Sequence, residues 1–201
     1  GAVFLGIIGG LGRLSRRVVW SQLAAIYVEV IRGTPLLVQV LLGYFCFAEL
    51  AANILKGAGA ATALVAFVQD PYVVGVVVLS IFTGAYVTEI VRAAVESIDR
   101  GQTEAARAQG MTQAQVYRHV VFPQALRRMT PPLAGQFVSL VKDSSLLMLI
   151  PGVVELARSS SLIRSRTYKD YEVLLPLGLA YFIICFSLSR LARRLELRLA
   201  D

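Results

Sequence analysis

The chain is organised as long apolar stretches separated by polar segments. Four of these stretches carry two charged residues or fewer, and two of them run for 17 residues without any charge. At a rise of ~1.5 Å per residue, helices of this length can cross a hydrocarbon core of ~30 Å with help from their flanks. The pattern therefore predicts four membrane-spanning helices. They lie at residues 33–55, 72–88, 129–154 and 173–189.

Residues 1–12 form a further apolar stretch that is too short to span a membrane alone. It is followed by Arg13, Arg16 and Arg17, whereas the charges of a secretory signal peptide precede its apolar run. We interpret this stretch as the cytoplasmic half of a first spanning helix whose beginning is missing. The expected total is five spans, with the first one truncated.

The composition favours a membrane protein over a soluble one. Of the 201 residues, 56% are hydrophobic, and the mean hydropathy is +0.65. Four buried helices of a soluble protein would need a far larger shell of polar chain around them. The expected fold is therefore all-α, a polytopic membrane helical bundle, with residues 1–201 forming one transmembrane domain without internal repeats.

Several positions indicate where the helices begin. Residues 18–32 have apolar positions at helical spacing and are expected to lie in the membrane interface before the second span. Thr34 is expected to cap the second span, with Pro35 in its first turn. Pro131 and Pro132 are expected at the entry to the fourth span.

The net charge of +7 is distributed unevenly across the predicted membrane. Fourteen of the twenty Lys and Arg residues fall on the side that holds the segment between the third and fourth spans, and five fall on the other side. The positive-inside rule assigns the richer side, and with it the C-terminus, to the cytoplasm. Residues 157–171 are basic on the opposite side and depart from the rule. The distribution accounts for the charge without nucleic acid as a partner.

The longest polar region, residues 92–128, shows the capping pattern of short helices. Asp99 and Thr112 are each followed three residues later by Gln, as in a capping box. Gly110 lies between them and can adopt the left-handed conformation that ends a helix. The predicted helices span residues 99–109 and 112–121, and Pro123 either interrupts the second helix or starts another.

The same region contains a spaced motif. Glu-Ala-Ala is followed after three residues by Gly, and then after nine residues by Val-Val-Phe-Pro. This spacing resembles the EAA loop of bacterial ABC importer permeases, with Val120 and Phe122 in place of Ile and Leu. The tripeptide is common in helices, so the resemblance depends on its spacing within a basic loop between spans. The motif residues are Glu104, Ala105, Ala106, Gly110 and Pro123, in residues 99–123, which we call the coupling segment.

Other stretches extend the resemblance over nearly the whole chain. RGTPL at residues 32–36, YVTEIVR at 86–92, PQALRR at 123–128 and LVKDSSL at 140–146 are similar to polar amino acid permeases of the histidine, glutamine and arginine type. The resemblance implies a permease subunit of an ATP-driven amino acid importer in the lipid of the bacterial plasma (inner) membrane. The implied partners are an ATPase dimer that binds ATP and magnesium, a second permease subunit and an extracytoplasmic solute-binding protein. The chain has no GxxxxGK[ST] phosphate-binding loop, so no cofactor is expected in it.

The coupling segment is expected to transmit closure of the ATPase to the spans, because a short rigid helix docked in a cleft can carry a displacement. Ala105 and Ala106 would let a partner approach closely, and Glu104 offers a charge-assisted contact. Gly110 permits the turn, and Met111 is expected to be an apolar anchor. Without the resemblance, Glu104 is explained at least as well as an acid that favours the dipole at a helix start.

Two adjacent charges, Lys142 and Asp143, lie midway along the predicted fourth span. A charge at the bilayer centre costs about 2.5–3.5 kcal/mol on insertion scales, so the pair needs a cavity or partners. One hypothesis is a polar path in which Asp143 faces a cationic group of the substrate and Lys142 faces a carboxylate. The other is that the pair ties the third and fourth spans together through Glu89. The hypothetical path also includes Gln136 and Ser139, on one helical stripe with Asp143, and Thr83, where the family varies.

Other functions receive little support from the residues. One His, two separated Cys and no base beside the Ser residues predict neither a metal site nor a catalytic site, so the chain is not expected to be an enzyme itself. Glu89, Arg92, Glu96 and Arg100 have the spacing of helical ion pairs, as in a helix that extends the third span into the cytoplasm. The rival hypothesis is an ATP-independent secondary transporter or channel, which would favour internal repeats and more charge within the membrane.

Overall fold

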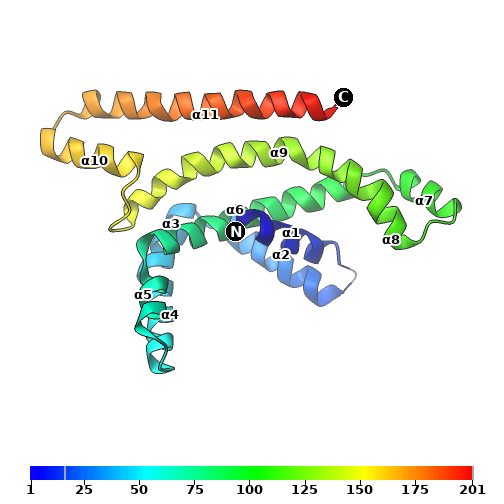
Figure 1. Ribbon diagram of the computed structural model, residues 1–201, viewed down its shortest axis with the longest axis horizontal. Coiled ribbons are helices and arrows are strands. Elements are labelled where there is room, and N and C mark those ends of the chain that lie inside the picture. Colours follow the sequence, from blue (N-terminus) through cyan, green and yellow to red (C-terminus); the bar gives the residue numbers. More distant parts are fainter. Residues whose placement is uncertain (16, 201) are drawn as a thin grey trace.

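The computed structural model describes the backbone of residues 1–15 and 17–200, and side chains as far as Arg194. Arg16, one of the charges expected to close the first span, lies outside the described residues. The prediction of an all-α protein is confirmed, because every element in the described part of the chain is a helix (Figure 1). The α-helices are α1 (Ala2–Arg13), α2 (Val18–Gly33), α3 (Leu36–Leu42), α4 (Glu49–Gly57), α5 (Thr62–Gln69), α6 (Pro71–Glu96), α7 (Arg100–Ala108), α8 (Gln113–Val116), α9 (Phe122–Asp143), α10 (Leu156–Thr167) and α11 (Asp170–Ala200). Shorter helical turns, η1 (Gly43–Ala48, π), η2 (Tyr117–Val121, π) and η3 (Ser144–Leu149, 3₁₀), connect some of them.

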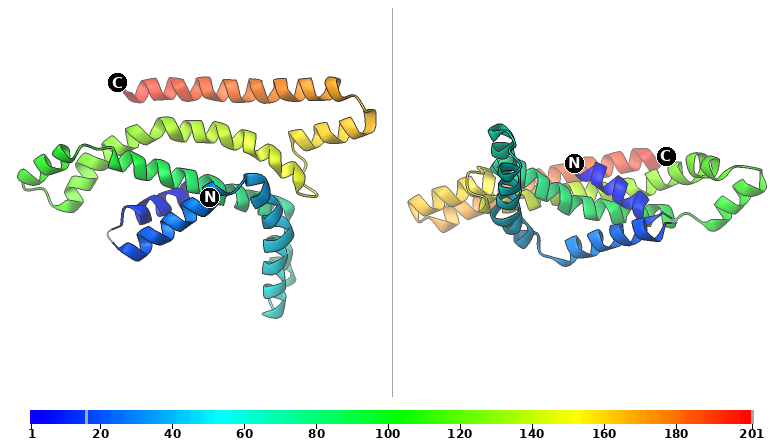
Figure 2. Two further views of the ribbon diagram at one scale, coloured as in Figure 1. Left: turned by 180° about the vertical axis from the view of Figure 1, so that it is seen from behind. Right: turned by 90° about the horizontal axis from the view of Figure 1, so that it is seen from below.

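Three long helices define the length of the molecule. Helix α9 packs against α6 and against α11, and all three follow the long axis (Figure 1). Helices α7 and α8 lie at one end of this axis and α10 at the other. Helices α4 and α5 form a hairpin that projects away from the long helices (Figures 1 and 2). The two ends of the bundle are therefore built from different short helices.

Among the residues that the structure describes, three helices are long and apolar enough to cross a membrane. They are residues Leu36–Gly57, Pro71–Glu96 and Asp170–Arg194, and they match the predicted second, third and fifth spans. Helix α1 is also apolar but is shorter than these three. Asp70 begins the third span by accepting hydrogen bonds from the backbone N–H groups of Tyr72 and Val73.

The predicted fourth span differs from the structure. Its helix, α9, begins at Phe122 and ends at Asp143, and η3 continues from there to Leu149. Pro131 and Pro132 therefore lie inside α9 and do not mark its start. The prediction was wrong because α8, η2 and α9 follow one another without a break, so the helical run starts well before the prolines. The prolines remove two N–H donors, and α9 is visibly curved in Figure 1.

The start of the second span is also different from the prediction. Thr34 ends α2 and does not cap α3, whose N-cap is Pro35. The Thr34 hydroxyl donates to the Val30 carbonyl oxygen at 2.9 Å, so it is already engaged with the preceding helix. Gln39 reaches back and donates to the Thr34 hydroxyl oxygen at 2.7 Å. These bonds fix the corner between α2 and α3.

Helix α1 is held against α6 by glycines. A Cβ atom at Gly6 would lie 2.3 Å from Cγ1 of Val87, and one at Gly10 would lie 2.5 Å from Cγ1 of Val91. Small residues let helix backbones approach in this way, which is a common basis of helix association in membranes. The two contacts run in the same order along both helices, so α1 and α6 are parallel. This orientation is expected when one further span, which crosses in the opposite direction, lies between them in the sequence.

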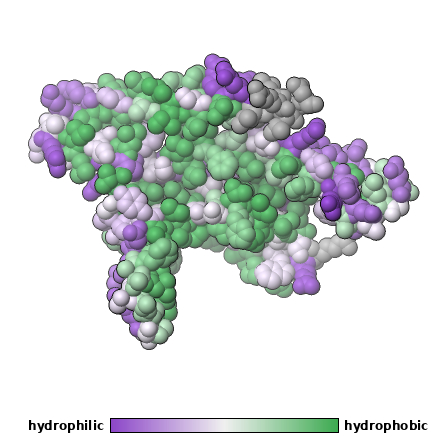
Figure 3. Space-filling view, in the orientation of Figure 1, coloured by the Kyte–Doolittle hydropathy of each residue, from purple (hydrophilic) through white to green (hydrophobic). Residues whose placement is uncertain are grey.

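Much of the apolar surface is not covered by this chain. The apolar window of α11 has no buried residue, and green apolar side chains cover much of the face shown in Figure 3. A soluble monomer rarely exposes patches of this extent. The surface is suited to lipid and to other membrane subunits.

Candidate functional site: the coupling segment

The first helix of the coupling segment is built as the sequence predicts. Asp99 caps α7 by accepting a hydrogen bond from the backbone N–H of Gly101 at 2.6 Å. The helix ends before Gly110, which has a φ of 84°. The N–H of Met111 returns to the Ala106 carbonyl oxygen at 3.2 Å, which closes the turn. Glycine adopts this left-handed conformation without steric cost, so the predicted role of Gly110 in the turn is confirmed.

The second helix begins with a complete capping box. The Gln115 side chain accepts from the Thr112 N–H at 2.8 Å, and the Thr112 hydroxyl accepts from the Gln115 N–H at 3.4 Å. The helix was predicted to end near Val121, but α8 passes through the π-turn η2 directly into α9. Pro123 is in the first turn of α9, and the Gln124 side chain donates to the Val120 carbonyl oxygen at 2.9 Å. The coupling segment is thus continuous with the fourth span.

The inner face of the segment has a hydrophobic core of its own. Ile98 at the end of α6 packs with Ala106 of α7 and with side chains from α8 and η2. Met111 is half-buried against this cluster. The expectation that Ala106 and Met111 face a partner is therefore corrected, because both face inward and hold the segment together. The remaining core residues are Val116 and Val121, with Val95 and Val120 packed against them.

The outer face of α7 is small and polar. Glu104, Ala105 and Ala108 are exposed, on the side away from the buried Ala106. Arg107 donates to the Gln113 side chain at 2.8 Å and so bridges the turn. The result is a rigid helix that offers a carboxylate and two methyl groups, with little side-chain bulk to prevent close approach.

The residues of the hypothetical substrate path fall in separate places. Thr83 is fully buried in α6, and its hydroxyl has no hydrogen-bond partner among the described residues. Glu89 is paired with Arg92, whose Nε lies 3.0 Å from Oε2, and Arg92 also pairs with Glu96. The predicted ion pairs of Arg92 with Glu89 and Glu96 are confirmed, whereas Arg100 forms no ion pair among the described residues because α6 ends at Glu96 and Arg100 begins α7. In the described part of the chain Glu89 forms no ion pair with Lys142, so the structure lacks the proposed tie through Glu89.

The remaining path residues lie on α9. Asp143 is its last residue, so the pair with Lys142 stands at the end of the α-helix and not midway along one continuous span. The prediction that the pair lies midway along the span was wrong because α9 begins at Phe122, before the predicted start at residue 129, and ends at Asp143. Lys142 and Ser139 line a cleft of about 380 Å³ between α9 and α11, and Gln136 is half-buried on the same helix. The cleft also includes Ser189 and Arg193, which the sequence analysis did not identify because they belong to another span.

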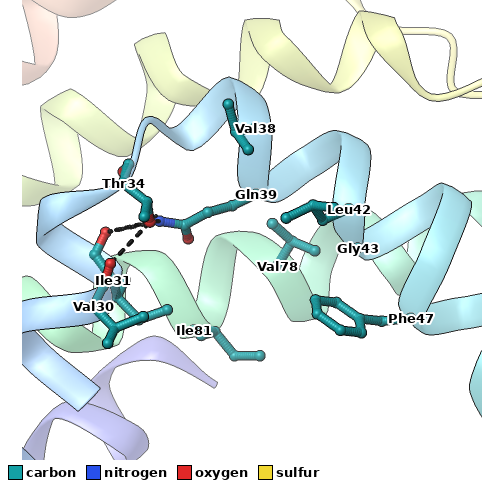
Figure 4. Close-up of a pocket in the computed structure, with 10 residues that line it drawn as sticks. All are labelled: Val30, Ile31, Thr34, Val38, Gln39, Leu42, Gly43, Phe47, Val78 and Ile81. Carbon is teal, nitrogen blue, oxygen red and sulfur yellow. Dashed lines mark hydrogen bonds between the residues drawn. The ribbon is translucent and has the colours of Figure 1, made fainter. Parts of the chain in front are cut away.

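A second cavity lies at the corner between α2 and α3. It measures about 250 Å³ and is almost entirely apolar, with Val78 and Ile81 of α6 on one side (Figure 4). Gln39 points toward Thr34 in this view and is occupied by the hydrogen bonds that fix the corner. The lining offers no charged group, so it is unsuited to a polar amino acid.

Together, the apolar spans and the segment with its own hydrophobic core describe a polytopic helical membrane protein. The family described as "Binding-protein-dependent transport system inner membrane component" matches residues 2–201. The chain belongs to this family.

Individual relatives agree with this assignment. The probable glutamine ABC transporter permease protein GlnP of Bacillus subtilis is 38% identical over 198 residues, covering 97% of this chain and 84% of the relative. The glutamine transport system permease protein GlnP of Escherichia coli K12 is 37% identical over 199 residues, covering 99% and 84%. These relatives favour an ABC permease over a secondary transporter or channel.

Solved structures agree as well. The crystal structure of an amino acid ABC transporter with histidines contains a chain that is 36% identical, with a TM-score of 0.81, covering 98% of this chain and 85% of that one. A chain of the inward-facing MetNI methionine ABC transporter shares the fold at 18% identity, with a TM-score of 0.73, covering 98% and 89%.

Proposed function

We propose that this chain is the permease subunit of an ATP-driven importer of polar amino acids. The observation that carries the proposal is the two-sided construction of the coupling segment. Its inner face is packed on the end of α6, and its outer face presents Glu104, Ala105 and Ala108 to the surroundings. A segment with a packed inner face and an outer face of small exposed side chains is suited to docking an ATPase subunit.

The proposed coupling follows from the connectivity. Helix α8 continues through η2 into α9, so a push on the segment acts directly on the helix that carries Lys142 and Asp143. The core around Ile98 passes the same push to α6. Interfaces of this kind convert small displacements into rearrangements of packed helices. Alternating access would then arise from motion of α6 and α9 relative to the other spans.

The partners and the orientation are part of the proposal. The coupling segment and the C-terminus would be cytoplasmic, in line with the charge distribution. ATP and magnesium would be bound by a dimer of ATPase subunits and not by this chain, which would have no enzymatic activity of its own. A second permease subunit would cover the exposed apolar face, and a binding protein would deliver the amino acid at the opposite end.

The proposed substrate path follows α9. The cleft between α9 and α11 combines Lys142 and Arg193 with the hydroxyls of Ser139 and Ser189. Asp143, the last residue of α9, follows Lys142 in the sequence and adds an acidic group to this end of the helix. This set of groups suits a zwitterion, whose carboxylate would face the cations. Gln136, Glu89 and Thr83 remain candidates for the path on α9 and α6.

The test uses the complete complex of permease, ATPase and binding protein in proteoliposomes. We expect uptake of a polar amino acid that requires ATP, and ATP hydrolysis that the loaded binding protein stimulates. Ala105→Trp should abolish both by blocking the outer face of α7, whereas the matched change Ala63→Trp on exposed α5 should leave them near normal. Uptake that persists without the ATPase subunits would overturn the proposal.

A further inference from the structure

Helix α10 and the turn after it lie at the end of the molecule opposite the coupling segment (Figure 1). Arg158, Arg164, Arg166 and Lys169 all lie within residues 157–171. These are the charges that depart from the positive-inside rule, which otherwise orders the chain well. Basic residues on the predicted extracytoplasmic side are therefore candidates for binding an acidic partner.

Both ends of α10 are fastened to α11. The Glu155 carboxylate caps α10 by accepting from the N–H of Ala157 at 2.8 Å, and it also accepts from the Tyr181 hydroxyl of α11 at 3.1 Å. At the other end, Arg164 lies 3.7 Å from the Asp170 carboxylate at the start of α11. These contacts hold the basic surface in one orientation, so little order has to be gained on binding.

Two tyrosines stand out from this surface. Tyr168 ends α10 with a left-handed backbone, at a φ of 56°, and its side chain is 87% exposed. It is the one non-glycine residue with positive φ in the described part of the chain. Tyr171 is 80% exposed. Tyr and Arg are, with Trp, enriched among the residues that contribute most to the binding energy of protein interfaces.

The surface is less suited to lying on lipid. Leu162 and Ile163 are the exposed apolar residues of the middle of α10, and Arg166 falls between them on the helical wheel. A helix that rests on a bilayer needs a continuous apolar face. The interruption by Arg166 favours a protein partner with acidic groups.

We propose that this surface, which we call the α10 patch (Arg158, Arg166, Tyr168, Lys169 and Tyr171), docks an acidic face of the solute-binding protein. The proposal rests on the function proposed above, because it requires that the α10 end be extracytoplasmic. Family membership supplies the existence of a binding-protein partner. The charge and the exposed aromatics specify the kind of surface that this partner presents.

The experiment measures the dissociation constant of the substrate-loaded binding protein for the assembled complex in nanodiscs. At low ionic strength, Arg166→Glu should raise this constant about tenfold or more, with a smaller effect in high salt. Lys56→Glu makes the same change of charge at the end of α4, where the side chain is also exposed, and should change the constant less than about twofold. Equal effects of the two changes would show that the binding protein responds to the overall charge of the complex and does not dock on the α10 patch, and would overturn the proposal.

Tyr168 provides a second variant that preserves the fold. Asn tolerates the left-handed conformation, so Tyr168→Asn removes the aromatic ring without adding strain. We expect weaker binding of the binding protein and unchanged ATP hydrolysis in its absence. Comparing nanodiscs with and without anionic lipid identifies the competing outcome: if the α10 variants change only the response to lipid, the patch is a lipid contact and the proposal is wrong. If the wild-type complex is not stimulated by the binding protein at all, the proposed function fails first.

Discussion

The guanidinium of Arg128, in the second turn of α9, donates to both the carbonyl oxygen and the hydroxyl of Ser97, the C-cap residue of α6. Its Nη1 lies 2.9 Å from the Ser97 Oγ, although the two residues are 31 positions apart. The coupling segment lies between them in the sequence. The contact therefore closes the base of the segment, so that a displacement of α7 or α8 reaches α6 and α9 together.

Loss of this contact should weaken coupling. Arg128→Gln removes the charge and the double hydrogen bond, and we expect substrate uptake per ATP hydrolysed to fall about tenfold, in the range of typical coupling free energies. The cost in stability should be only about 1 kcal/mol, since both residues are exposed. Parallel measurement of uptake and ATP hydrolysis in proteoliposomes checks the expectation.

Arg127→Gln is the matched control, since Arg127 is the exposed neighbour and makes no side-chain hydrogen bond among the described residues. It should retain the wild-type ratio of uptake to hydrolysis. If Arg128→Gln also keeps that ratio, the contact with Ser97 plays no part in coupling.

The turn at Gly110 should require a residue that tolerates positive φ, and it should not be limited by the room available for a side chain. A Cβ atom at Gly110 meets nothing within 4 Å, but its φ of 84° is unfavourable for most residues. Gly110→Val should distort the segment at a cost of ~1–3 kcal/mol and abolish uptake, because β-branched residues are poorly tolerated there. Gly110→Asn should retain most uptake. Equal loss in both variants, at normal levels of inserted protein, would show that the glycine contacts a partner directly.

The sequence predicted those features that depend on local chemistry. The spans α6 and α11 follow from their charge-free runs, since lipid admits few charges. The cap at Asp99, the capping box at Thr112 and the turn at Gly110 each depend on residues three or four positions apart. Such signals do not need knowledge of the tertiary structure.

Features that depend on packing were predicted less well. Prolines often mark a helix start, but Pro131 and Pro132 lie inside α9, because this helix begins nine residues earlier, at Phe122. Met111 was expected to be an apolar anchor for a partner, and its packing against the cluster around Ile98 becomes visible only in three dimensions. Arg193 joins Lys142 in the cleft across 50 residues of sequence, a relation that no local pattern contains.

The close contact of α1 with α6 predicts a sensitive position at Gly6. Gly6→Val would place methyl groups into Val87, and overpacking of this kind costs about 1–3 kcal/mol. We expect the Tm of the purified complex in detergent to fall by several degrees. Gly178→Val in α11 is the control, because a Cβ atom there meets nothing within 4 Å. Equal thermal stability of the two variants would mean that α1 is not held to α6 in the assembled protein.

The role of Asp143 can be separated from a structural one by the choice of substrate. If its carboxylate faces a cationic side chain of the substrate, Asp143→Asn should raise KM for a cationic amino acid such as arginine by about tenfold or more, and change KM for glutamine much less. If it only positions helices, the loss should be similar for both substrates and should come with reduced thermal stability.

The measurement is uptake of both amino acids over a range of concentrations in proteoliposomes that contain the full complex. Glu49→Gln is the control, since Glu49 is an exposed acid of another span. Substrate recognition by the binding protein must be measured separately, because a change there would also alter KM. Identical kinetics of Asp143→Asn and wild type for both amino acids would remove Asp143 from the translocation path, and would leave Lys142 and Arg193 as the charged groups of the cleft.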